Sequence, residues 1–190
     1  MQTQKAENIR AFVAVALPSE VQAAIEGLQQ ELKPQRLNLR WVKPENIHLT
    51  VKFLGDIGTG EVENVKQVIA DTARTLRPLQ LRAQGIGVFP GPRRPRVLWV
   101  GLAGDTEALG ALARDIDSRL ADLGFARENR PFKAHLTIGR FKKDGHPGDV
   151  AGALERHRDF AAGTFPVGAI HLFRSQLRPE GPVYTQLSEF

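Results

Sequence analysis

The sequence contains no cysteine, so it can form neither a disulfide bond nor a thiolate metal site. It also lacks any run of about eighteen apolar residues, and we therefore expect no membrane-spanning helix. The first eight residues, MQTQKAEN, do not include the apolar stretch of a secretory signal peptide. From these absences we predict a cytoplasmic protein.

The composition is otherwise that of an ordinary globular protein, with more basic than acidic residues. The 190 residues are 42% hydrophobic and 25% charged, which is enough for one domain with a sizeable core. The formal net charge of +5 favours anionic partners such as RNA or nucleotides.

The spacing of apolar residues predicts a mixture of helices and strands. Helices are predicted over residues 19–33, 61–76, 106–123 and 150–157, where apolar residues recur at helical spacing. Strands are predicted over residues 10–17, 39–42, 47–55, 79–88, 96–102 and 134–140. Residues 165–190 are predicted to form two more strands, joined by a turn at Pro179-Glu180-Gly181.

The sequence also contains an internal repeat. A constant offset of 87 residues superimposes His48-Leu49-Thr50 on His135-Leu136-Thr137 and Pro44 on Pro131, and it pairs Phe12 with Trp99. Each half therefore contains a strand, a capped helix and a strand that carries P-x-x-x-H-L-T. Two such halves, related by an approximate two-fold axis, would bring the two motif strands opposite each other.

The repeated tripeptide places polar side chains on one face of each strand. Because side chains alternate along a strand, His48 and Thr50 share one face and Leu49 faces the other way. The second copy, with His135 and Thr137, has the same alternation. The plainer interpretation is that these are structural sheet residues, which is the better one for a single His-x-Thr. For a matched pair in a repeat, we favour a site.

Two histidines on either side of a phosphodiester can divide an acid–base reaction. With an unperturbed pKa of about 6.5, a neutral imidazole can deprotonate the nucleophile and a protonated one can donate to the leaving oxygen. Threonine hydroxyls can hydrogen-bond the phosphoryl oxygens on which charge accumulates. This chemistry requires no metal, cofactor or covalent nucleophile.

Three segments resemble a known superfamily. R-x-F-V-A-V-x-L-P, H-L-T-V-K-F-L-G and H-L-T-I-G-R are similar to segments of the 2H phosphoesterases. Within these they resemble the RNA 2′,3′-cyclic phosphodiesterases, long called 2′–5′ RNA ligases or LigT-like proteins. The resemblance runs from about Arg10 to the C-terminal strands, where it holds in general outline. It implies one bilobal α+β domain over residues 1–190, with two antiparallel sheets related by a pseudo-two-fold axis, outer helices and a central cleft.

The resemblance also implies an activity and a role for each site residue. The activity is hydrolysis of 2′,3′-cyclic phosphates on RNA ends or nucleotides to 2′-phosphates, and we expect a monomer without a metal. His48 would be the general acid that protonates the 3′ oxygen, and His135 the general base that activates water. Thr50 and Thr137 would hold the phosphoryl oxygens, and Arg140 would add positive charge.

Strand alternation and the resemblance disagree about the cation of the site. Lys52 has the parity of His48, whereas Arg140 has the opposite parity to His135. A bend or bulge at Gly139 would bring Arg140 to the histidine face. Alternation alone favours Lys52, and we follow the resemblance in choosing Arg140.

Two other functions stay open at this point. The reverse reaction, ATP-independent joining to a 2′–5′ linkage, would use the same groups, and a non-catalytic RNA- or nucleotide-binding module could retain the same fold. Lys142-Lys143-Asp144-Gly145 matches the K-x-D-G motif of ATP-dependent ligases, but the further elements of such a ligase are not recognisable. We therefore assign no function to this segment.

Several other residues receive predictions of their own. Arg93, Arg94 and Arg96 are predicted on or beside a loop near the site, where they would contact an RNA backbone. His146 and His157 are predicted to be exposed, and His171 to be structural. Phe12, Phe53 and Trp99 are assigned to the core in preference to stacking on a base.

Overall fold

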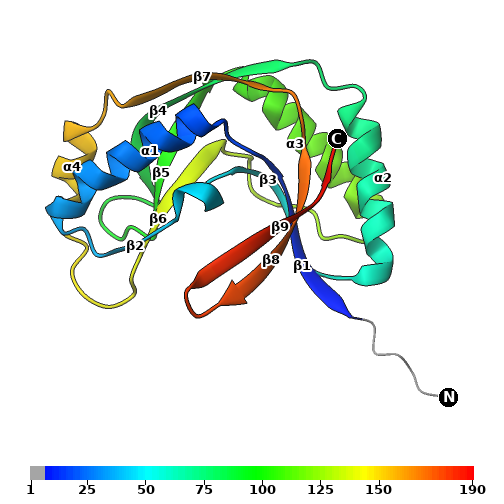
Figure 1. Cartoon of the computed structure of the whole chain (residues 1–190), viewed down its shortest axis with the longest axis horizontal. Coiled ribbons are helices and arrows are strands. Elements are labelled where there is room, and N and C mark those ends of the chain that lie inside the picture. Colours follow the sequence, from blue (N-terminus) through cyan, green and yellow to red (C-terminus); the bar gives the residue numbers. More distant parts are fainter. Residues whose placement is uncertain (1–6) are drawn as a thin grey trace.

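Nine strands form one antiparallel sheet in the computed structural model, which describes residues 7–190 (Figure 1). The strands lie in the order β7-β4-β5-β6-β3-β1-β8-β9, with β2 paired to β6. Their bounds are β1 Asn8–Val15, β2 Leu39–Trp41, β3 Leu49–Gly58, β4 Leu79–Phe89, β5 Val97–Gly104, β6 His135–Phe141, β7 Ala161–Val167, β8 His171–Arg178 and β9 Gly181–Glu189. The helices are α1 Ser19–Leu32, α2 Val62–Ala73, α3 Thr106–Asp122 and α4 Val150–Arg156. Within residues 7–190, no helix has the length and apolar character needed to cross a membrane.

The sheet consists of two halves that meet at a single residue pair. Strands β3 and β6 pair at Leu49 and Leu136, whereas each of them pairs along several residues with its other neighbour. Both leucines are fully buried. The predicted α+β fold with two related antiparallel sheets is confirmed, and the two sheets are continuous through this leucine pair.

The pairing registers confirm the internal repeat and correct its alignment. Ala14 lies opposite Thr50 in the first half, and Trp99 lies opposite Thr137 in the second. Trp99 is therefore the counterpart of Ala14, whereas the constant offset pairs it with Phe12. The offset is wrong for the leading strands because the connections that follow them differ in length, which a comparison without gaps cannot register.

Each half of the chain supplies a helix to the sheet of the other half. Helix α1 follows β1 in the sequence but contacts β7, and α3 follows β5 but contacts β3 (Figure 1). The side-chain amide of Gln29 on α1 donates to the carbonyl oxygens of Val42, at 2.8 Å, and Ile138, at 2.9 Å. On the other side, Lys52 of β3 is bonded to Asp117 of α3. These buried polar contacts hold the two halves together.

Most of the predicted elements are confirmed to within a few residues, and the tail is the exception. The predicted turn after Arg178 joins β8 to β9, but the preceding residues 161–167 form a further strand, β7, that pairs with β4. The tail therefore has three strands instead of two. The first four residues of β7, Ala-Ala-Gly-Thr, show no apolar–polar alternation, so only their pairing with β4 defines the strand.

Candidate active site

The side chains of the two motifs surround the leucine pair at the centre of the sheet. Antiparallel pairing of Leu49 with Leu136 places the residue before one leucine next to the residue after the other. The polar neighbours of the leucines are all half-buried: His48, Thr50, His135 and Thr137. The leucines fill the core on one face, so the four polar side chains gather on the other, as the repeat predicts.

Both histidines are held by the same backbone contact. His48 Nδ1 lies 2.8 Å from the carbonyl oxygen of Asn46, and His135 Nδ1 lies 2.6 Å from that of Lys133. A carbonyl oxygen only accepts, so Nδ1 carries a hydrogen in each ring and Nε2 is left to take or give a proton. Sequence reasoning missed these partners, although each stands two residues before its histidine.

Aromatic rings enclose His48. Its ring stacks on Phe12 with a centroid separation of 4.6 Å and meets the edge of Tyr184 at 5.2 Å. Tyr184 lies on β9, and the side-chain amide of Asn46 ties this strand to the motif by donating to the carbonyl oxygen of Pro182 at 3.0 Å. Sequence reasoning missed Tyr184, because the C-terminal strands show no motif that marks a site.

The surroundings of His135 are less enclosed. The edge of its ring meets Phe89 at a centroid separation of 5.0 Å, and the Lys133 ammonium lies 5.7 Å from the centre of the Phe89 ring. Trp99 supports Phe89 from the sheet. Its indole occupies the space over Gly87, where a Cβ atom would come within 2.2 Å of the ring. A side chain at Gly87 would therefore displace the support of His135.

Two β-bulges decide which cation reaches the site. Val51 in β3 and Ile138 in β6 have no partner in the registers of their strands, and each reverses the alternation of the residues that follow. Arg140 thereby joins the face of the histidines, as the resemblance implies, and Lys52 leaves it. We expected this bulge at Gly139, and it falls one residue earlier, at Ile138.

The prediction from alternation for Lys52 is wrong. The Lys52 ammonium bonds the carboxylate of Asp117 and the carbonyl oxygen of Ala126, at 2.6 Å from the latter, and the side chain is 7% exposed. The bulge at Val51 turns Lys52 away from the histidines and towards Asp117. Because burying an ammonium without a partner is costly, the ion pair with Asp117 stabilises Lys52 in this position. Lys52 therefore connects β3 to α3 on the face opposite the site.

The environment of His48 disfavours its charged form. Burial is the main cause that lowers its pKa from 6.5 to about 4, the hydrogen bond to Asn46 opposes this, and the positive charge of Arg140 lowers the pKa further. His48 is therefore neutral at pH 7 in the free protein. The positive charge of Arg140 is close enough to His48 to lower the pKa of its imidazole.

We expect the His48 resonances to titrate near pH 4 in the free protein and at higher pH in an Arg140→Gln variant, checked by NMR of the imidazole Cε1–H groups. The variant should not reach 6.5, because burial is the larger cause. Between pH 6.5 and 4 the unfolded chain binds a proton that the folded chain excludes. His48 therefore contributes stability above pH 6.5 that is lost as the pH falls towards 4. A midpoint near 6.5 in the unaltered protein would contradict this picture.

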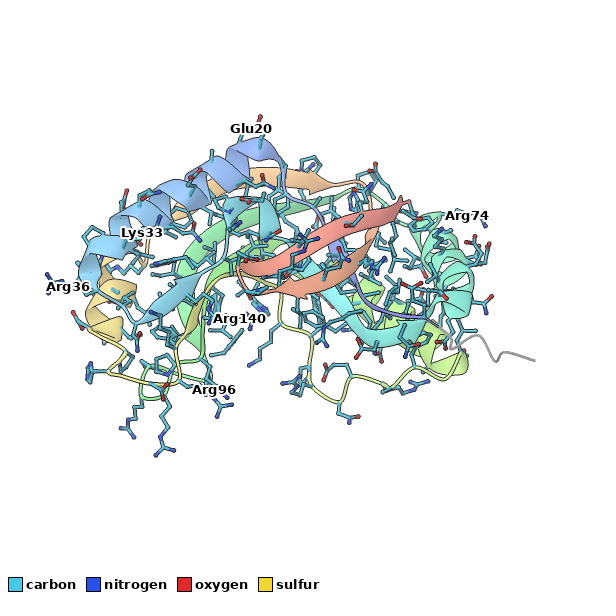
Figure 2. All side chains as sticks on the ribbon, turned by 60° about the horizontal axis from the view of Figure 1, so that its bottom comes forward. Glu20, Lys33, Arg36, Arg74, Arg96 and Arg140 are labelled. Carbon is cyan, nitrogen blue, oxygen red and sulfur yellow. The ribbon has the colours of Figure 1, made fainter. Side chains whose placement is uncertain are left out.

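The arginine loop borders the site. Arg93 and Arg94 lie in the turn between β4 and β5 with Arg96 at its end, and all three are exposed. The backbone amide of Phe141 donates to the Arg96 carbonyl oxygen at 3.0 Å, which joins this loop to the residue after Arg140. Figure 2 shows Arg96 and Arg140 in the same part of the molecule. Contact of the loop with an RNA backbone stays a prediction.

The remaining predicted histidines have mixed outcomes. His146 is exposed as expected. His157 is 13% exposed with Nδ1 3.6 Å from a Glu31 carboxylate oxygen, so the prediction of exposure is wrong for it. His171 is buried, with Nε2 3.3 Å from a carboxylate oxygen of Glu189. Residues 7–190 contain no group of three or more His, Asp or Glu side chains placed to hold a metal ion.

The assignment of three aromatic residues to the core also has different outcomes. Phe12 is 2% exposed and Trp99 is half-buried, whereas Phe53 is 64% exposed. The assignment to the core is confirmed for Phe12 and wrong for Phe53. Because Phe53 follows the bulge at Val51, it lies on the face of the site.

A known family accounts for both halves of this arrangement. The model described as LigT like Phosphoesterase matches residues 15–99 and, a second time, residues 100–184. The chain belongs to the LigT-like phosphoesterase family. Each of the two matches contains one of the motif strands, β3 in the first and β6 in the second.

Individual LigT-like relatives are similar over nearly their whole length. An RNA 2′,3′-cyclic phosphodiesterase of Methanothermobacter thermautotrophicus is 35% identical over 183 residues, which cover 96% of this chain and 98% of that protein. Among solved structures, TT0787 of Thermus thermophilus has a TM-score of 0.81 and 31% identity, with 96% and 97% of the two chains covered. LigT of E. coli, complexed with 3′-AMP, has a TM-score of 0.76 and 25% identity, with 97% and 98% covered.

Proposed function

We propose that this LigT-like phosphoesterase hydrolyses 2′,3′-cyclic phosphates on RNA ends or nucleotides to 2′-phosphates. The observation that carries the proposal is the matched pair of histidines, each with Nδ1 fixed by a carbonyl oxygen and Nε2 free for proton transfer. The name of the Methanothermobacter relative supports the substrate class. We also expect a cytoplasmic monomer, as predicted from the sequence.

The two histidines act at opposite ends of the reacting phosphorus. Neutral His135 takes a proton from water at Nε2 as the water oxygen bonds to phosphorus, and the P–O3′ bond breaks. Protonated His48 gives its Nε2 proton to the departing 3′ oxygen, which leaves a 3′-hydroxyl and a 2′-phosphate. Thr50 and Thr137 hydrogen-bond the phosphoryl oxygens, and Arg140 offsets their negative charge. Proton exchange with solvent restores both histidines.

The low pKa of His48 fits this role once substrate is bound. A phosphodiester anion beside His48 favours the imidazolium form and offsets the charge of Arg140, which is one cause of the low value. Binding thus brings a proton to the general acid at the moment when it is needed. Arg140 therefore serves the phosphate and also makes a smaller contribution, after burial, to the low pKa of His48 in the empty site.

We expect the protein to convert adenosine 2′,3′-cyclic phosphate to adenosine 2′-phosphate at an undiminished rate in EDTA, followed by ³¹P NMR. The product position tests which P–O bond breaks, and EDTA tests the expectation that no metal takes part. Formation of the 3′-phosphate would contradict the roles given to the histidines. Binding of the cyclic phosphate without turnover would favour the non-catalytic module. Net formation of 2′–5′ linkages from cyclic phosphate and 5′-hydroxyl ends would favour the ligase.

A further inference from the structure

Helix α1 carries a glutamine whose side-chain amide is buried against β6 and the end of β2. Gln29 is 2% exposed, and its Nε2 donates to the carbonyl oxygen of Val42 at 2.8 Å and to that of Ile138 at 2.9 Å. A side-chain amide has two N–H donors, and both are used here. The backbone amide of Val42 donates to the same Ile138 oxygen at 3.0 Å, so two donors share this acceptor.

The Ile138 oxygen belongs to the bulged residue of the second motif strand. Ile138 has no partner in the register of β5 with β6. A bulge leaves its extra residue unpaired and the ladder locally disrupted, so the pairing with β5 does not fix Ile138. A carbonyl oxygen has two lone pairs, and here Gln29 and Val42 take up both of them. The bulge is therefore held by α1 and by the chain that follows β2.

The place of the bulge decides where Arg140 points. With the bulge at Ile138, Arg140 lies on the same face as His135 and Thr137. Regular alternation along β6 would turn Arg140 to the face of the buried leucines, away from the histidines. The bond from Gln29 stands two residues before Arg140, and the bulge cannot move along β6 without breaking it.

The first half secures its own bulge with a helix of the other half, but with a different result. There Lys52, the residue after the bulge at Val51, is buried and bonded to Asp117 of α3. In the second half the helix binds the backbone of the bulged residue and leaves Arg140 exposed. The backbone contact thus fixes the bulge without using the cation, which stays available to an anion in the site.

We propose that Gln29 is a positioning residue that holds Arg140 on the face of the histidines. Its effect on turnover rests on the proposed function, in which Arg140 offsets the negative charge of the phosphoryl oxygens. One intramolecular hydrogen bond is worth roughly a 2- to 10-fold change in an equilibrium constant, so we expect an effect of that size from its loss.

The test replaces the amide by a side chain of similar length that cannot donate. Gln29→Met should lower kcat/KM for adenosine 2′,3′-cyclic phosphate roughly 2- to 10-fold. It should also move the titration of the His48 imidazole from near pH 4 to higher pH, as Arg140→Gln does, because the positive charge is held less closely. A purely structural role would lower the stability of the fold and move neither quantity. If Gln29→Met does not fold, Gln29→Asn, whose amide reaches less far, serves for the same comparison.

Two comparisons separate positioning from a loss of stability. In an Arg140→Gln background, Gln29→Met should change neither kcat/KM nor the His48 titration, because the group that Gln29 positions is already absent. Gln30→Met, at an exposed position of the same helix, and Ile25→Val, which shortens a buried side chain of α1, should leave both quantities unchanged. Equal losses from Gln29→Met with and without Arg140 would overturn the proposal.

The NMR titration of His48 separates this proposal from the proposed function, because it requires no turnover. If His48 responds to Gln29→Met only while Arg140 is present, but no cyclic phosphate is turned over, the hydrolase function fails and the positioning role stands. If turnover is normal and neither kcat/KM nor the His48 titration depends on Gln29, the positioning role fails alone.

Discussion

Replacement of His48 or of His135 by alanine is expected to lower kcat for 2′,3′-cyclic phosphate hydrolysis by roughly 10²- to 10⁴-fold, with a smaller effect on KM. Each substitution removes one of the two proton-transfer groups from the transition state, and general acid–base catalysis contributes about this factor. Initial rates with adenosine 2′,3′-cyclic phosphate measure the effect.

A double variant and a control substitution at a third histidine make this experiment more decisive. Because the two histidines act in one step, the double variant should lose less than the product of the single losses. His146→Ala is the matched control, since His146 lies exposed in a loop, and it should keep normal kcat. Circular dichroism should show the same fold in every variant. Normal turnover in either His48→Ala or His135→Ala would refute the assignment of the site.

Replacement of Asp117 by alanine is expected to lower the free energy of unfolding by roughly 3 kcal/mol. The substitution leaves the Lys52 ammonium, 7% exposed, without its carboxylate partner, and removes the acceptor of the Glu128 backbone amide. Chemical denaturation at pH 7 measures the loss.

The pH dependence of this ion pair has a defined sign. Burial raises the pKa of Asp117, but its contacts with Lys52 and with the Glu128 amide outweigh burial and hold the pKa below its usual range. The stability that the pair contributes is therefore present above the ordinary carboxyl pKa and is lost as the pH falls through the lowered value.

Two variants distinguish a buried charge from an ordinary surface pair. Arg119→Ala breaks an exposed pair with Asp115 on the same helix and should cost less than about 1 kcal/mol. Lys52→Met in the Asp117→Ala background removes the unpaired ammonium and should restore most of the stability. If the double variant is as unstable as Asp117→Ala alone, the cost does not arise from the buried charge. Retained kcat in Lys52→Met would agree with the place of Lys52 away from the site.

Much of the site could be predicted because it depends on short-range regularities. Side-chain alternation put His48 with Thr50, and the repeated tripeptide put His135 with Thr137, before any tertiary contact was known. Pairing across the two halves then followed from an approximate two-fold axis, and the Leu49–Leu136 pair confirms it. The carbonyl partners of the histidines could not be predicted, because they depend on how the chain turns just before each motif strand.

The sequence by itself determined the two motifs, their repetition and the choice of acid–base chemistry, since these depend on residue type and a local period of two. Only the tertiary structure decided that Arg140 and Phe53 face the site while Lys52 does not. A bulge is set by the partner strand and by what the following side chains must contact, and for Lys52 that contact is Asp117, on a helix of the other half. Tyr184 and strand β7 were likewise fixed by partners distant in the sequence, which no local pattern of residues encodes.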